Sequence, residues 1–184
     1  MFGVMKTIFI FLIVISSFSN LYSDETLVNK LKQGENIIFI RHALAPGSGD
    51  PKNFDLNDCN TQRNLNAEGI DQSKEIGAFF IKNSIPIDQV LSSEWCRCKD
   101  TAKYAFKNYE TFSALNSFFS KRFQNNKEKQ NADLLNFLNK WQSKKNIVLV
   151  THYVVILAIT NKPVSSGEII ILDKNLNFIG TIVL

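Results

Sequence analysis

Two runs of apolar residues in this chain continue without alternating with polar positions. Residues 37–40 read Ile-Ile-Phe-Ile, and residues 147–150 read Ile-Val-Leu-Val. A strand with apolar side chains on both faces is typical of the centre of a parallel sheet, where helices cover each side. The two runs therefore predict buried strands over residues 36–41 and 146–152.

Helical periodicity and turn residues surround these strands. Residues 67–83 place apolar side chains at helical spacing after Asn66, a residue type that favours helix N-caps. The same reasoning predicts further helices over residues 25–34, from Ser93 to Lys107, 132–143 and 154–160, a third buried strand over residues 89–93, and a hairpin of residues 168–173 and 178–184. Strands that alternate with helices predict an α/β fold: a mostly parallel sheet with helices on both faces, to which the C-terminal hairpin adds antiparallel strands at the edge.

The N-terminal residues carry a different pattern. Lys6 precedes an apolar run over residues 7–15, and small polar residues follow, an order that predicts a secretory signal peptide over residues 1–23. The alternative is a retained membrane anchor, which needs about 18 consecutive apolar residues, but Ser16 and Ser17 interrupt this run. We therefore expect an exported protein, periplasmic or secreted, which contacts the membrane only through this segment if the segment is not cleaved. Residues 24–184 then fit a single domain.

Composition narrows the class of protein. Hydrophobic residues make up 45% and charged residues 21% of the chain, as in soluble globular proteins. The net charge of +4 is mild and scattered, and the polar stretch over residues 121–131 predicts a solvated loop. We therefore expect no nucleic-acid partner.

Three cysteines, Cys59, Cys96 and Cys98, lie beyond the predicted signal segment. An oxidising compartment allows one pair to form a disulfide, and we expect Cys59 to bridge to Cys96 or to Cys98. We expect no metal site, because the chain has only two histidines and the spacing of Cys96 and Cys98 is tighter than a zinc knuckle requires.

Polar residues lie at or just beyond the end of each of the three predicted buried strands. The first strand leads into Arg41 and His42, the second leads through two serines to Arg97, and the third leads into His152. Because ligands of open α/β sheets bind beyond the carboxyl ends of the strands, these side chains are expected to meet at one rim. Taken singly, each is more often a structural residue. Together they suit a phosphate: guanidinium groups hold its oxygens, one neutral imidazole can attack phosphorus, and the other can stabilise the transition state.

The residues around these positions also resemble a known family. FIRHA (39–43), LSSEWCRCKDTA (91–102) and VLVTHY (148–153) are similar, in this order, to the signature blocks of the histidine phosphatase superfamily, which includes cofactor-dependent phosphoglycerate mutases and many phosphomonoesterases. TQRNLNAEG (61–69) matches a fourth block. The resemblance implies a phosphoglycerate mutase-like fold, no metal and no organic cofactor. It also implies a set of site residues: His42 as the phosphorylated nucleophile, Arg41, Arg97 and His152 as phosphate-pocket residues, and Arg63 near the pocket rim.

Two departures from the family pattern bear on function. Ala43 stands where the family usually has glycine after the nucleophile. The family also commonly supplies an acidic proton donor after the second arginine block, but the matching segment ALNSFFSKRF (114–123) has no carboxylate. Glu94 is then the candidate acid, with a glutamate that only interacts with a helix dipole as the alternative. These residues predict an exported phosphatase that hydrolyses a small phosphomonoester. The alternative is a protein that binds phosphate or a phosphorylated ligand without turnover.

Overall fold

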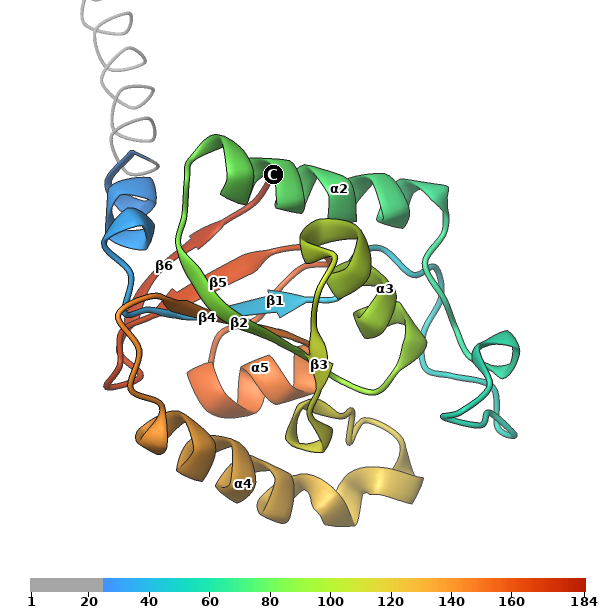
Figure 1. Cartoon of the computed structure of the whole chain (residues 1–184). Helices are drawn as coiled ribbons and strands as arrows, with labels where there is room; N and C mark the ends of the chain where they lie inside the picture. Colours follow the sequence, from blue (N-terminus) through green and yellow to red (C-terminus); the bar gives the residue numbers. More distant parts are fainter. Residues whose placement is uncertain (1–24) are drawn as a thin grey trace, which may run out of the picture.

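The computed structural model describes residues 25–184 as a six-stranded sheet between two layers of helices (Figure 1). After a helix over residues 25–33, the elements follow in the order β1 (Ile37–Arg41), η1 (Cys59–Thr61), α2 (Ala67–Lys82), β2 (Ile87–Ser92), α3 (Cys96–Phe106), β3 (Glu110–Thr111), η2 (Ser113–Leu115), η3 (Lys121–Asn126), α4 (Lys127–Lys140), β4 (Asn146–Thr151), α5 (Tyr153–Thr160), β5 (Ile169–Leu172) and β6 (Phe178–Ile182).

The sheet has the strand order β3-β2-β4-β1-β5-β6. β4 pairs in parallel with both β1 and β2, and β3 adds a short parallel pairing to β2. β5 and β6 form an antiparallel hairpin, and β5 also pairs antiparallel with β1. The predicted α/β fold with a mostly parallel sheet and a C-terminal hairpin at the edge is therefore confirmed.

The central strands are buried on both faces because their alternate side chains enter two different cores. Ile38 and Ile40 of β1 pack with α2 and α3, whereas Ile37 and Phe39 pack with α4 and α5. α2 and α3 also approach each other closely: a Cβ atom at Gly77 would lie 2.3 Å from the carbonyl oxygen of Ala105. The continuous apolar runs in the sequence thus reflect two helical layers, which Figure 1 shows above and below the sheet.

Three local predictions need correction. The helix predicted from Ser93 begins at Cys96, because Trp95 is still in an extended conformation and the Ser93 hydroxyl contacts the Trp95 amide (3.3 Å) and His152. Residues 121–131 are largely exposed, but they form η3 and the start of α4 instead of a loop. The helix predicted over residues 132–143 therefore begins earlier and ends at Lys140.

The predicted signal peptide over residues 1–23 lies outside the described residues. Within residues 25–184, no helix combines the length and apolar composition that a membrane span requires.

Candidate active site

The register of β1 and β4 places the two histidines side by side. Arg41 is the register partner of Thr151, so the next residue on each strand is a histidine, and the His42 amide donates to the Thr151 carbonyl (2.9 Å). The ring centroids of His42 and His152 are 5.5 Å apart, and each residue is 3% exposed. Two imidazoles that lie 110 positions apart in the chain therefore share one buried site.

Arg97 reaches the same place from the second strand. β2 ends beside β4, where the Ser93 amide donates to the Val150 carbonyl (2.9 Å), and the chain then turns into α3, whose second residue is Arg97. Arg97 is 3% exposed, and its Nη2 lies 3.5 Å from Nδ1 of His152. The predicted meeting of His42, Arg97 and His152 at one rim is thus present in the structure.

Hydrogen bonds fix which nitrogen of each imidazole carries the proton. A carbonyl oxygen can only accept, so Nδ1 of His42, 2.8 Å from the oxygen of Ala43, is the protonated nitrogen, and Nε2 keeps its lone pair. Arg97 can only donate, so Nδ1 of His152 accepts and its Nε2 donates to the Ser93 hydroxyl (2.8 Å). His42 therefore presents an unprotonated Nε2, as a nucleophile requires.

Burial and positive neighbours keep both imidazoles neutral. Desolvation lowers the pKa of His42 well below its usual value, and the charges of Arg97, Arg41 and Arg63 lower it further. The pKa of His152 is also lowered well below its usual value, first by desolvation and then by Arg97. Neutral His42 is the form that can attack phosphorus.

The other two predicted arginines lie at the same cavity with different contacts. Arg41 is half-buried, and its Nη1 donates to the Val164 carbonyl (2.9 Å), while its buried Nε has no hydrogen-bond partner among residues 25–184. Nε of Arg63 donates to the Gly49 carbonyl (2.7 Å) and its Nη1 donates to the Ala45 carbonyl. Arg63 thus holds the loop that follows His42, in addition to its charge at the rim.

Glu94 is not among the residues that line this cavity. Its carboxylate accepts a hydrogen bond from the side-chain amide of Asn116, whose oxygen in turn accepts from the Glu94 amide (2.9 Å). Because α3 begins at Cys96, Glu94 is not in the first turn of a helix either. The structure therefore gives no support to the expectation that Glu94 donates the proton.

Asp50 is the carboxylate that the sequence interpretation missed. It lies in the loop that follows His42, after Gly47 and Gly49, whose φ angles are positive, and before η1. Its side chain is 9% exposed. Its two oxygens accept from Nη1 (2.7 Å) and Nη2 (3.2 Å) of Arg97. A single aspartate in a loop rich in glycine and proline is ordinarily a turn residue, so no periodicity or spacing marked it.

The cysteines connect the same loop to α3. Cys59 forms a disulfide with Cys96, one of the two pairings that were expected. Cys98 is free and buried, and burial raises the pKa of its thiol to about 12. The disulfide therefore holds the loop against the first turn of the helix that carries Arg97, and Cys98 is an inert core residue.

A cavity of about 370 Å³ is lined by the two histidines and Asp50, together with Arg41, Arg63 and Arg97. Its cations are Arg41, Lys52, Arg63, Arg97 and Arg122, and its aromatic walls are Phe54, Trp95, Phe119, Phe123 and Tyr153. Such a mixture suits an anionic group attached to a small organic body. Among residues 25–184, no group of three histidine, cysteine or acidic side chains is arranged to hold a metal ion.

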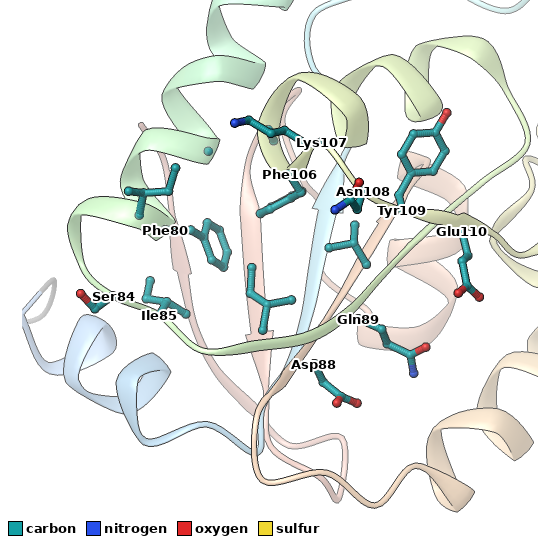
Figure 2. A pocket seen from close by; sticks show the side chains of 15 residues that line it. Phe80, Ser84, Ile85, Asp88, Gln89, Phe106, Lys107, Asn108, Tyr109 and Glu110 are labelled. Carbon is teal, nitrogen blue, oxygen red and sulfur yellow. The ribbon is translucent and has the colours of Figure 1, made fainter.

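A second cavity, of about 650 Å³, lies between the C-terminal ends of α2 and α3 and the start of β2 (Figure 2). Apolar side chains such as Phe80, Ile85 and Phe106 dominate its walls, and neither a histidine nor an arginine contributes to it. The histidines and arginines that the sequence resemblance implies for a phosphate site therefore line the smaller cavity and not this one.

Comparisons with known proteins agree with this fold. No family model and no curated protein matches the chain. Solved structures that it resembles include the protein histidine phosphatase SixA complexed with tungstate (TM-score 0.57, 16% identity, 79% of this chain and 95% of that chain). They also include a phosphoglycerate mutase from Thermus thermophilus (TM-score 0.59, 16% identity, 81% and 99%) and TTHB049 from the same organism (TM-score 0.58, 16% identity, 81% and 99%). The chain therefore has the phosphoglycerate mutase-like fold of these structures, as the sequence resemblance implied.

Proposed function

We propose that this protein is an exported phosphatase that hydrolyses a small phosphomonoester through a phosphohistidine intermediate on His42. The observation that carries the proposal is the buried, neutral His42, whose Nδ1 bonds to the Ala43 carbonyl while Arg97 and His152 lie beside it. The residues that we propose as nucleophile, anion-binding cations and second imidazole all line one cavity. The fold shared with a protein histidine phosphatase and a phosphoglycerate mutase supports this chemistry.

The proposed reaction has two steps. Arg41 and Arg97 hold the phosphoryl oxygens, and Nε2 of His42 attacks phosphorus as the ester bond breaks. Water then cleaves the phosphohistidine and returns the lone pair to Nε2. His152 stabilises the charge that gathers on the equatorial oxygens in both transition states. None of these steps requires a metal ion or an organic cofactor.

The cavity favours a small ester over a folded protein substrate. Its volume of about 370 Å³ lies at the low end of small-molecule sites. Lys52 and Arg122 stand among its lining residues beyond the arginines that meet the histidines, so an organic body with a second anionic group fits this cavity. Phosphohistidine on a protein is the competing substrate.

Export rests on two features. The apolar run over residues 7–15 has the length of a signal-peptide core, and Cys59 and Cys96 form a disulfide, which persists in oxidising compartments. We propose that the working protein is periplasmic or secreted.

The decisive experiment is hydrolysis of an aryl phosphate by the purified, oxidised protein and by His42→Ala. The proposal expects turnover that the substitution abolishes, and label from a phosphorylated substrate that is acid-labile, alkali-stable and located on His42. The control is binding of inorganic phosphate, which His42→Ala should retain because Arg41 and Arg97 remain. Phosphate binding without turnover on a broad panel of esters would favour the alternative, a phosphate-binding protein.

A further inference from the structure

Asp50 is the one carboxylate among the residues that line the cavity in the described part of the chain. It meets the end of the Arg97 guanidinium as a two-pronged acceptor, with distances of 2.7 and 3.2 Å. Its oxygens also accept from the Arg63 amide (3.1 Å) and from the indole nitrogen of Trp95 (3.1 Å). An anionic side chain therefore occupies donors of Arg97 that a phosphate would use.

Arg97 has few other donors to offer. Nη1 also contacts the Arg63 carbonyl (3.3 Å), Nη2 also contacts His152, and the buried Nε has no hydrogen-bond partner among residues 25–184. A phosphoryl group that binds to the Nη groups of Arg97 must take them, at least in part, from Asp50. Substrate binding therefore changes the surroundings of this carboxyl group more than those of the exposed acidic residues.

Binding of a phosphate at Arg97 should raise the pKa of Asp50, because Arg97 is what keeps this pKa low in the free protein. Burial acts to raise the pKa of Asp50, but the hydrogen bond and charge of Arg97, with smaller contributions from Arg63 and Trp95, hold it below its usual value. A phosphate that takes over Arg97 removes the largest lowering contribution and brings negative charge close by. Burial and repulsion then both favour the protonated carboxyl group.

The other ionisable groups that line the cavity with Asp50 are Arg41, His42, Lys52, Arg63, Arg97, Arg122, His152 and Tyr153. The two imidazoles are neutral, and the bound phosphate offsets part of the cationic charge. No other carboxyl group of the described residues competes for the proton at this site.

We propose that Asp50 is the acid that protonates the leaving oxygen, an assignment that rests on the proposed function. In the first step Nε2 of His42 forms a bond to phosphorus, the ester bond breaks, and its electron pair on the leaving oxygen takes the proton from Asp50. In the second step water attacks phosphorus, its proton passes to the Asp50 carboxylate, and the electron pair of the N–P bond returns to Nε2. Asp50 thus supplies the acid that the segment 114–123 and Glu94 do not.

The test compares wild type, Asp50→Asn and Asp50→Glu on phosphate esters whose leaving oxygens are increasingly basic, from nitrophenyl through phenyl to alkyl phosphates. Asparagine still accepts hydrogen bonds but has no proton to transfer. We expect kcat with alkyl phosphates to fall by about 10²- to 10⁴-fold in Asp50→Asn, with only a small loss on the nitrophenyl ester, which needs no acid. Asp50→Glu should recover part of the alkyl rate. Binding of inorganic phosphate, which no longer competes with a carboxylate, should not weaken in Asp50→Asn.

A role limited to holding Arg97 in place would lower turnover of all esters by the same factor, and that result would overturn the assignment. A second measurement needs no variant: in the wild type, the ratio of alkyl to nitrophenyl turnover should fall as rising pH deprotonates Asp50, and a constant ratio would also overturn it. Absence of turnover by the wild type would overturn the proposed function and the role of Asp50 together. Turnover that requires His42 but falls equally for all esters in Asp50→Asn would overturn the role of Asp50 alone.

Discussion

Acidification between pH 7.5 and 5.5 is expected to destabilise this protein through its two histidines. Burial and the neighbouring arginines lower the pKa of both His42 and His152 in the folded state well below the ordinary value of 6.5. The unfolded chain therefore binds more protons than the folded protein once the pH drops below about 6.5. The contribution of the two histidines to the free energy of unfolding is fully present above that pH. It is lost as the pH falls towards the folded-state pKa values.

The magnitude follows from proton linkage. A histidine that titrates normally in the unfolded chain and stays neutral in the folded protein contributes a loss of about 1.4 kcal/mol between pH 7.5 and 5.5. Both imidazoles are buried, so solvent screening does not reduce this figure. Together they should lower the free energy of unfolding by roughly 2.7 kcal/mol, a large fraction of the stability of an ordinary domain.

Urea denaturation at several pH values, in buffers free of phosphate, measures this loss directly. The control is the variant that carries His42→Gln and His152→Gln, which has no imidazole because the chain contains only two histidines. Acidic groups with shifted pKa values, such as Asp50 and Asp100, remain in both proteins and cancel in the comparison. An equal decline in stability for wild type and variant over this pH range would refute the claim that the folded imidazoles are held neutral.

Three further outcomes are expected. Replacing Cys59 and Cys96 together by serine should lower the free energy of unfolding by about 3–4 kcal/mol, because the disulfide closes a loop with a sequence separation of 37. Guanidinium denaturation measures this loss, and an equal free energy of unfolding for variant and wild type would contradict the prediction. Cys98 should resist alkylation in the native protein and react once the oxidised chain is unfolded, as mass spectrometry would show; rapid labelling of the native state would be inconsistent with a buried thiol whose pKa is about 12. Gly77→Ala should lower the free energy of unfolding by roughly 1–3 kcal/mol, since its Cβ would lie 2.3 Å from the Ala105 carbonyl oxygen. An unchanged thermal midpoint would show that α2 and α3 can move apart without loss of stability.

The histidines and Arg97 could be located from the sequence because they lie next to strands that are easy to identify. A continuous apolar run predicts a central strand, and the residue after a central parallel strand lies at the ligand-binding edge. His42 and His152 each occupy that position, and pairing of β1 with β4 then brings them together. The register itself was not predicted, because strands that are apolar on both faces offer no alternation from which to read it.

Asp50 and Glu94 could not be assigned in the same way, because their roles depend on tertiary contacts. Asp50 belongs to an irregular loop, whose path depends on Arg63, on two left-handed glycines and on the disulfide. Glu94 precedes α3, and the local sequence does not reveal that Asn116 holds its carboxylate. The N-terminus of α3 was misplaced for a similar reason, since the Ser93 hydroxyl that would have capped the helix contacts His152. Each error occurs where a polar side chain bonds to a residue that is distant in the sequence.

The disulfide has a clear physical purpose in this arrangement. The loop after His42 contributes Asp50 and the carbonyl of Arg63 to the surroundings of Arg97, yet it contains few core side chains to offset the entropy of ordering it. Its links to the start of α3 include the disulfide to Cys96, the Gln62 side chain that accepts from the Cys96 amide (3.0 Å), and the packing of Phe54 against Trp95. These links are next to Arg97 in sequence, so they constrain the loop at the guanidinium that exchanges Asp50 for phosphate in the proposed mechanism. The proposed exchange of Asp50 for phosphate at each turnover needs this fixed frame, because it is specific only if Asp50 returns to the same two donors of Arg97 after the product leaves.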